Sequence, residues 1–259
     1  MIEAIFVLGI LGFILAIILA FAFKKLRVEV DPKEEEIMKI LPGANCGVCG
    51  FSGCSGFTHA LLAKEEVSCP AGGSETKLKI ASILGIEITE KDEKKAIVKC
   101  RGSFPEAKEK FIYDGLDDCK AANLVAEGRK NCIYGCIGLG TCIKSCPFGA
   151  ISKGNNHLPV INRNKCTGCG KCIKNCPKKV ISLELNTRKV YVFCNSNDKG
   201  ILSRKNCKYA CIACGLCVKQ CEFDAIKLEN NLAIIDSNKC TNCKKCIEKC
   251  PTKTLVEIN

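Results

Sequence analysis

The chain has 259 residues, of which 24 are cysteine and none is tryptophan, and its formal net charge is +12. Much of its apolar content lies in one N-terminal run, so the remainder has little material for a large hydrophobic core and needs another source of folding free energy. The cysteines fall into repeated C-x-x-C-x-x-C runs, which is the spacing of metal ligands. This spacing favours metal sites over a disulfide framework, and with them a reducing compartment.

The N-terminal run predicts a membrane anchor. Residues 2–23 are apolar apart from one glutamate, and they are long enough for a helix that crosses a bilayer. A cleaved signal peptide fits poorly, because no basic segment precedes the run and no small-residue cleavage site follows it. Lys24, Lys25 and Arg27 come next, and basic flanks stay on the cytoplasmic side. We therefore predict a single-pass anchor at 1–27 in the cell membrane, with the bulk of the chain in the cytoplasm; a buried core helix is the alternative.

Residues 28–90 are predicted to form a small, mostly helical domain with four cysteines. Asp31 and Pro32 form a typical helix start, and further helices are expected at 58–66 and 76–84. Between them, a C-x2-C-x4-C segment is followed by a fourth cysteine before a proline, a spacing compatible with an iron–sulfur cluster. Glycines in this segment let the backbone fold around a bulky group. The predicted ligands are Cys46, Cys49, Cys54 and Cys69.

From Cys132 onward the sequence repeats itself. The bacterial ferredoxin run C-x2-C-x2-C-x3-C-P, in which the fourth cysteine binds the other cluster of a pair, is intact from Cys166 and from Cys240, and lacks only its proline from Cys211. Short strands are expected at 94–99, 183–185 and 232–235. The pattern predicts an α+β fold with two tandem two-[4Fe–4S] ferredoxin-like modules. Their predicted boundaries are 91–190, with extra cysteines, and 191–259.

The run also predicts which cysteines share a cluster. In the second module one set is Cys211, Cys214, Cys217 and Cys250, and the other is Cys221, Cys240, Cys243 and Cys246. In the first module one set is Cys146, Cys166, Cys169 and Cys172. The remaining run is irregular, because Leu139 stands where the repeat has a cysteine. We expect the missing thiolate to come from Cys132, giving a set of Cys132, Cys136, Cys142 and Cys176.

Four cysteines remain, which is the number that one cluster requires. We predict that a sixth cluster bridges the modules; if these residues are free thiols instead, the number of clusters is five. They are Cys100, Cys119, Cys194 and Cys207. Six clusters with four thiolates each would contribute about −12 and offset the formal charge, so we exclude nucleic acid as a partner.

Other metal and catalytic chemistry is not indicated. Zinc sites use two C-x-x-C pairs, which fits these cysteine triplets poorly, although a scaffold with structural zinc is a rival interpretation. His59 and His157 each stand alone, so we assign neither as a ligand. No dinucleotide fingerprint follows a predicted strand, and no catalytic residues can be singled out.

Several motifs resemble the B component of the Rnf electron-transport complex. They are the N-terminal anchor, the segment DPKEEEIMKILPGANCGVCGFSGC, the cysteine before P-x-G-G and the ferredoxin repeats, which together cover nearly the whole chain. The stretches DGLDDCKAA and CIYGCIGLGTC are similar to the long, cluster-rich form, whereas shorter members have a single two-cluster module.

The resemblance implies an electron-relay protein without a substrate-converting site of its own. It would take electrons from reduced ferredoxin within a membrane complex, an ion-translocating ferredoxin:NAD oxidoreductase that moves Na⁺ or H⁺. Other subunits would hold the NAD, flavin and ion sites. A membrane-bound polyferredoxin that serves a hydrogenase or another reductase is the alternative function.

Basic residues around the last cysteine run suggest where a ferredoxin docks. Ferredoxins are typically acidic, so an entry site should be locally basic. The candidates are Lys239, Lys244, Lys245 and Lys249. A solvated face that offsets the charge of the cluster is the alternative interpretation.

Overall fold

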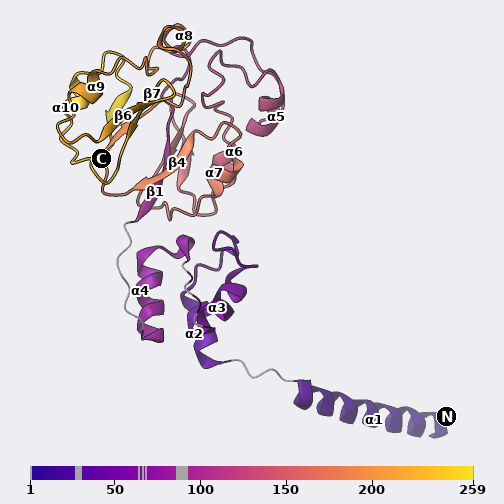
Figure 1. Cartoon of the computed structure of the whole chain (residues 1–259). Helices are drawn as coiled ribbons and strands as arrows, with labels where there is room; N and C mark the ends of the chain where they lie inside the picture. The colour runs from indigo at the N-terminus through magenta and orange to yellow at the C-terminus, as the bar shows by residue number, and fades with distance from the viewer. Residues whose placement is uncertain are drawn as a thin grey trace.

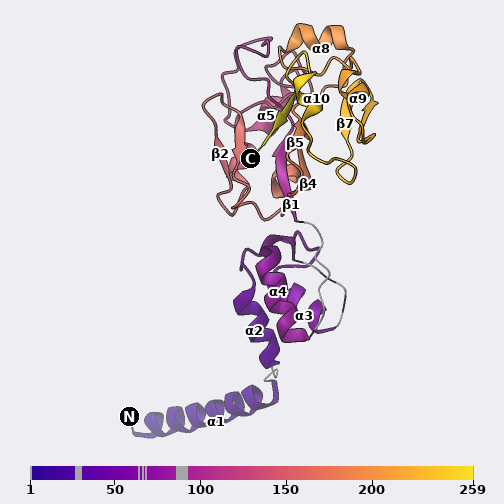
Figure 2. The same cartoon turned by 90° about the vertical axis from the view of Figure 1, so that its left-hand side faces the viewer.

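The computed structural model describes residues 2–26, 31–63, 65, 67, 69–85 and 93–258 (Figure 1). Three parts follow one another along the chain: an N-terminal helix, a small helical domain and a body that contains all the strands. Figures 1 and 2 agree that the helical domain lies between the N-terminal helix and the body. The predicted boundaries after residues 27 and 90 lie outside the described residues.

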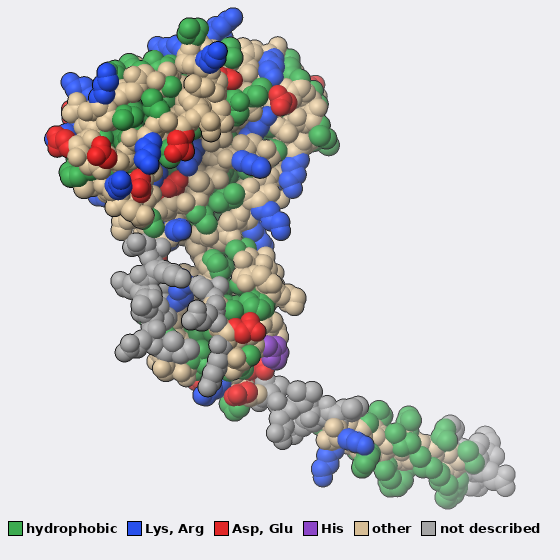
Figure 3. All heavy atoms as spheres, viewed as in Figure 1, with side chains coloured by type: hydrophobic (Ala, Val, Ile, Leu, Met, Phe, Trp, Pro, Cys, Tyr) green, Lys and Arg blue, Asp and Glu red, His purple; other side chains and the backbone are tan. Residues whose placement is uncertain are grey.

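The N-terminal helix α1 runs from Ile2 to Leu26 and projects away from the rest of the chain (Figure 1). The large apolar side chains that the structure describes between Phe6 and Phe23 lie open to solvent, with Phe13, Phe21 and Phe23 each about 70% exposed (Figure 3). Among the described residues, no helix meets the length and apolarity that crossing a membrane requires.

The helical domain packs three α-helices and one 3-10 turn around a small core. Its elements are α2 (Pro32–Ile40), α3 (Cys54–Leu62), η1 (Pro70–Gly72) and α4 (Gly73–Leu84). The predicted start of α2 is confirmed, because Asp31 caps the helix by accepting a hydrogen bond from the Lys33 N–H at 2.9 Å. Ile37 of α2 and Phe57 of α3 are almost completely buried in the core.

The body consists of two modules with the same strand pairing. In each module the first strand pairs antiparallel with the last, and the middle two strands pair with each other. The first module pairs β1 (Lys94–Val98) with β4 (Ile181–Leu185) and β2 (Ile151–Lys153) with β3 (Pro159–Ile161). The second pairs β5 (Val190–Val192) with β8 (Leu255–Glu257) and β6 (Ile226–Glu229) with β7 (Leu232–Ile235). The predicted boundary at 190/191 falls inside β5.

Short helices follow the same repeat. The first module has α6 (Thr141–Lys144) and α7 (Lys171–Asn175), and the second has α9 (Leu216–Lys219) and α10 (Lys245–Glu248). Two further helices, α5 (Cys119–Leu124) and α8 (Gly200–Asn206), precede the first cysteine run of each module. All these helices are too short to be stable alone, so packing around the cysteine runs must hold them in place.

Backbone hydrogen bonds join the two modules along one seam. The Arg101 N–H donates to the Phe193 carbonyl at 3.2 Å, and the Lys108 N–H donates to the Asn206 carbonyl at 2.9 Å. An isolated bridge pairs Ala107 with Cys207. Each module also has its own buried core. The seam therefore fixes the position of the modules relative to each other and brings cysteines of both to one place.

Candidate metal centres

Five cavities in the body are each lined by four cysteines. The space in each is similar, between about 320 and 400 Å³. The described residues include all 24 cysteines, and none of these forms a disulfide. We call the four-cysteine sets quartets and number them by their order in space. Quartet 2 is Cys146, Cys166, Cys169 and Cys172; quartet 3 is Cys119, Cys136, Cys142 and Cys176; quartet 4 is Cys100, Cys132, Cys194 and Cys207. Quartet 5 is Cys211, Cys214, Cys217 and Cys250; quartet 6 is Cys221, Cys240, Cys243 and Cys246.

Quartets 2, 5 and 6 group the cysteines as the ferredoxin run predicts. The short helices explain the grouping, because the cysteine within each helix and the one at or just beyond its C-terminus face different cavities. Around α6, Cys142 belongs to quartet 3 and Cys146 to quartet 2, while around α7 Cys172 belongs to quartet 2 and Cys176 to quartet 3. The helices α9 and α10 divide their cysteines between quartets 5 and 6 in the same way.

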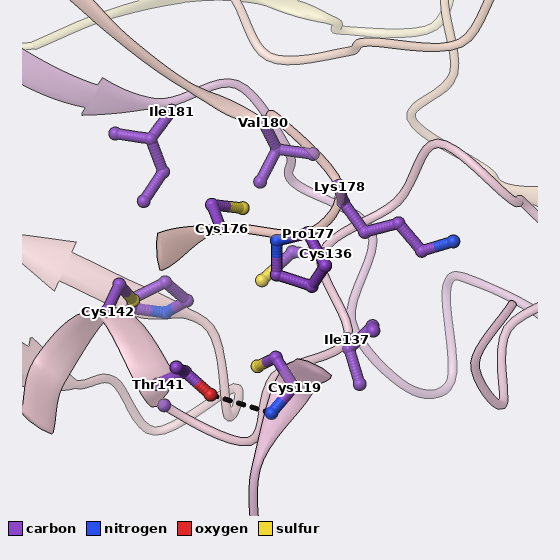
Figure 4. Close-up of a pocket in the computed structure, with 12 residues that line it drawn as sticks. Cys119, Cys136, Ile137, Thr141, Cys142, Cys176, Pro177, Lys178, Val180 and Ile181 are labelled. Carbon is purple, nitrogen blue, oxygen red and sulfur yellow. Dashed lines mark hydrogen bonds between the residues drawn. The ribbon is translucent and has the colours of Figure 1, made fainter. Parts of the chain in front are cut away.

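Quartet 3 differs from the grouping expected from sequence. Cys119, not Cys132, lines the cavity with Cys136, Cys142 and Cys176, and Figure 4 shows the four thiols around one common space. Burial raises the pKa of Cys142 to about 11, with smaller contributions from the neighbouring thiols of Cys119 and Cys176. Cys119 therefore occupies the position that Leu139 leaves without a ligand.

A hydrogen-bonded clamp brings Cys119 into quartet 3. Asp118 caps α5 by accepting from the Lys120 and Ala121 N–H groups, and its other oxygen accepts from the Thr141 hydroxyl at 2.8 Å. The same hydroxyl oxygen accepts from the Cys119 N–H at 2.6 Å, as the dashed line in Figure 4 shows. Thr141 is the first residue of α6, so the clamp ties the start of α5 to the helix that carries Cys142.

Quartet 4 lies on the seam and takes two cysteines from each module. Cys100 lies two residues after β1, and Cys194 lies two residues after β5. Cys132 precedes Cys136 by the same four positions by which Cys207 precedes Cys211. The members of quartet 4 thus occupy equivalent positions in the two repeats. The equal offset of Cys132 and Cys207 is the signal in the sequence that we did not use when we grouped the cysteines. The expected grouping is wrong in placing Cys119 here, because Cys119 lies in quartet 3.

The helical domain brings together the four cysteines predicted for it, which we call quartet 1: Cys46, Cys49, Cys54 and Cys69. Asn45 shapes the loop, because its side-chain oxygen accepts from the Cys54 N–H at 2.8 Å. A Cβ at Gly53, where φ is +96°, would lie 2.8 Å from that oxygen, so only glycine fits. Burial raises the pKa of Cys69 despite N–H groups of Gly72 and Ala71 that point at its sulfur.

The quartets suit a group that needs deprotonated thiols. Burial raises the pKa of Cys172 and Cys194 to about 12 and of Cys217 and Cys246 to about 11, so binding must release protons. Backbone N–H groups point at several sulfurs; those of Ala96, Ala150 and Thr254 donate to the Sγ atoms of Cys166, Cys146 and Cys250 at 3.3 to 3.4 Å. Such donors stabilise the thiolate form of a cysteine and tune the reduction potential of an iron–sulfur cluster. Four thiols around an apolar space of uniform size fit a [4Fe–4S] cluster. Within the described residues, no three His, Cys, Asp or Glu side chains are placed to hold a single metal ion.

Contacts between neighbouring quartets give them a linear order. Quartets 1 and 2 meet at Cys46 and Cys169, which pack in one core cluster; burial raises the pKa of Cys169, and negative charge at Cys46 raises it further. Quartets 2 and 3 meet in the same way at Cys172 and Cys142. The Cys136 N–H donates to the Cys100 sulfur, which links quartets 3 and 4, and the Cys211 N–H hydrogen-bonds Cys194, which links 4 and 5. Quartets 5 and 6 share the helices α9 and α10, which pack together.

The four candidate docking lysines differ in their surroundings. Lys244 forms an ion pair with Glu257 at 2.7 Å, and Lys245 forms one with Glu222. Lys239 and Lys249 are exposed and enter no salt bridge among the described residues. Cys243 of the same run is one of two exposed cysteines, the other being Cys214. The solvent-exposed end of the quartet series therefore carries unpaired positive charge.

Two family profiles match the chain. The profile described as "4Fe-4S dicluster domain" matches residues 135–181 and 210–255, and the one described as "Putative Fe-S cluster" matches residues 41–70. These segments cover the ferredoxin runs of both modules and all four cysteines of quartet 1.

Three relatives match nearly the whole chain, and each is the B component of its complex. One, from an ion-translocating oxidoreductase complex of Methanosarcina acetivorans, is 40% identical, over 98% of this chain and 97% of the relative. A second, from a proton-translocating ferredoxin:NAD(+) oxidoreductase complex of Clostridium ljungdahlii, is 43% identical, over 97% and 90%. A third, from a Na(+)-translocating ferredoxin:NAD(+) oxidoreductase complex of Acetobacterium woodii, is 43% identical, over 95% and 74%.

Proposed function

Because this chain belongs to the family of B components of ion-translocating oxidoreductase complexes, we propose that it relays electrons from reduced ferredoxin through six [4Fe–4S] clusters inside a membrane complex that reduces NAD. The single observation that carries the proposal is that all 24 cysteines fall into six quartets. A bound [4Fe–4S] cluster supplies one-electron transfer without a substrate-converting site in the protein.

The thiols of each quartet would hold one cluster. Quartet 4 supports the number six, because its cavity has the size and the donors of the other four in the body. Backbone N–H groups would set the potential of each cluster, and these donors differ between sites. Cys250 illustrates this: burial raises its pKa, but the hydrogen bonds from Leu255, Thr252 and Thr254 together outweigh burial and leave the pKa lowered.

The linear order of the quartets supports a direction for the relay. Quartet 6 is the last of the series and contains the exposed Cys243; Lys239 directly precedes its Cys240, and Lys249 directly precedes Cys250 of quartet 5. An acidic ferredoxin would dock there. Quartet 1 lies at the other end, in the domain next to α1 (Figures 1 and 2). Electrons would leave from quartet 1 towards the other subunits.

Membrane attachment through α1 is part of the proposal. The helix is continuous from Ile2 to Leu26, its exposed apolar side chains have no partner in the described part of the chain, and Lys24 and Lys25 lie in its last turn. The basic residues at this end would favour a cytoplasmic position for the remaining domains. The coupling ion, Na⁺ or H⁺, would be handled by other subunits.

Anaerobic purification of the protein with its complex tests the proposal. The expected iron content is about 24 atoms per chain if each quartet holds four irons, and subunits of a ferredoxin:NAD oxidoreductase should co-purify. About 20 irons, with four alkylatable thiols at Cys100, Cys132, Cys194 and Cys207, would remove quartet 4 from the proposal. Co-purification with a hydrogenase would favour a polyferredoxin, and zinc in place of iron would contradict the relay altogether.

A further inference from the structure

A buried lysine lies on the seam where the relay passes from one module to the other. Lys130 is only 5% exposed, although lysine is among the residues least often buried. Its Nζ donates to two backbone carbonyls, that of Gly102 at 2.5 Å and that of Cys136 at 2.6 Å. Among the described residues, no carboxylate forms an ion pair with it.

Lys130 lies next to residues of two quartets. It lines the cavity of quartet 4, two residues before Cys132, and its second carbonyl partner belongs to Cys136 of quartet 3. Burial raises the pKa of Cys136 and of Cys207. The positive charge of Lys130 offsets part of this rise, because it favours the thiolate form of both residues. One amino group therefore acts on both sides of the junction.

The negative charge of the bound clusters explains how a lysine can be buried here. A buried cation is costly unless opposite charges and hydrogen bonds compensate it. The two carbonyls supply the hydrogen bonds, and two four-thiolate sites, each about 2− when oxidised, supply the charge. Conversely, a positive charge next to a cluster favours its reduced form, which carries one more negative charge.

We propose that Lys130 raises the reduction potentials of the clusters in quartets 3 and 4, and so lets electrons cross between the modules. The inference rests on the proposed relay function. Reduction of two neighbouring clusters places like charges close together, and Lys130 offsets that repulsion at the junction. Each transfer moves one electron, which reduces the acceptor cluster and oxidises the donor cluster; no bond forms or breaks, and no proton is required.

The test is a dye-mediated redox titration of the full chain followed by EPR, which requires neither ferredoxin nor NAD. Two neutral variants separate charge from hydrogen bonding: Lys130→Gln keeps an N–H donor, and Lys130→Met removes it. In both, one or two cluster midpoints should shift so that the reduced form is disfavoured about tenfold, equal to 59 mV for one electron. The remaining midpoints should not move. Lys110→Met is the matched control, because Lys110 also donates to a backbone carbonyl, that of Ala126, but is exposed.

Three outcomes would overturn the inference. Unchanged midpoints in both variants would make Lys130 a structural hydrogen-bond donor only. A shift in Lys130→Met without one in Lys130→Gln would assign the effect to the hydrogen bonds instead of the charge. Loss of iron from both variants would show that cluster binding, and not potential, depends on Lys130. Failure of the relay proposal is distinguishable, because the unmodified protein would then lack the clusters.

Discussion

The backbone N–H of Cys136 donates a hydrogen bond to the Sγ of Cys100 at 3.4 Å, so that a residue of quartet 3 touches a thiol of quartet 4. Cys136 and Cys100 are well separated in the sequence of the first module, and the contact lies at the seam with the second module. The two quartets are therefore physically coupled. The experiments on quartet membership therefore need to tell the two quartets apart.

Two pairs of single cysteine-to-serine substitutions test which cysteines belong to quartets 3 and 4. Because Cys119 and Cys176 line one cavity, Cys119→Ser and Cys176→Ser should weaken or convert the same EPR signal. Cys132→Ser and Cys194→Ser should alter a second signal, because they line the other cavity. Each variant should lose up to about four irons, one cluster's worth. Cys214→Ser serves as control and should change a third signal.

The grouping expected from sequence makes the opposite prediction. If Cys132 completed the set with Cys136, Cys142 and Cys176, then Cys132→Ser would reproduce the spectrum of Cys176→Ser. That match would contradict the arrangement in the structure.

Two glycines in the cavity of quartet 4 provide a matched pair. A Cβ at Gly102 would lie 2.9 Å from the Cys207 sulfur, whereas a Cβ at Gly135 would meet nothing nearer than the Cys132 carbonyl at 3.4 Å. Gly102→Ala should therefore displace Cys207 and cost about four irons, while Gly135→Ala should keep full iron content. Iron analysis and EPR measure the difference. Equal iron content in both variants would show that Cys207 is not held where the structure places it.

The unpaired lysines near quartet 6 should govern the encounter with ferredoxin. Lys239→Glu with Lys249→Glu should slow reduction by reduced ferredoxin several-fold at low ionic strength, with the gap narrowing as salt rises, because steering between exposed charges is screened. Stopped-flow absorbance measures the rate. Reversal of Lys244 and Lys245 should also slow it, but those variants lose ion pairs with Glu257 and Glu222 as well.

A control with the same change in charge separates the effect of a local docking site from the effect of the net charge of the protein. Lys153→Glu with Lys165→Glu makes the same change on exposed positions of the first module. If this control slows the reaction more than the quartet 6 variant does, ferredoxin docks on the first module.

Removal of residues 1–27 tests the membrane attachment. The truncated chain should stay in solution after vesicles are sedimented and should keep its brown colour and iron, because α1 contributes no cysteine. The full chain should sediment with the vesicles. Loss of iron on truncation would instead make α1 part of the cluster-binding fold.

The cysteine runs can be predicted from sequence because their spacing is local. Quartets 2, 5 and 6 follow from C-x2-C-x2-C-x3-C, since one short helix fixes which thiols face which cavity. The predicted strand at 232–235 has the bounds of β7, and the start of α2 follows from its cap residues. Helix α3 begins at Cys54, before the predicted position 58, because a contact from Asn45 fixes its first turn.

Quartets 3 and 4 cannot be predicted from spacing alone, because their members meet through tertiary contacts. Cys119 reaches quartet 3 through the Asp118–Thr141 clamp, which joins residues far apart in the sequence. Lys130 gives no signal either, since a lysine in a basic chain is ordinarily a surface residue. Counting the cysteines left over by the ferredoxin runs correctly assigns Cys100, Cys194 and Cys207 to the bridging set, and the equal offset of Cys132 and Cys207 within the repeat points to its fourth member.

Quartet 4 takes two cysteines from each module, and this has a consequence for the order in which the protein is assembled. Cys100 and Cys132 leave the ribosome well before Cys194 and Cys207 are made, so a nascent chain can finish the first module while its half of quartet 4 still has no partner. If each quartet holds a cluster as proposed, insertion at quartet 4 would have to wait for the seam to close, whereas the cysteines of quartets 1, 2 and 3 are complete earlier in the chain. A chain that ends before Cys194 therefore lacks half of the residues of quartet 4.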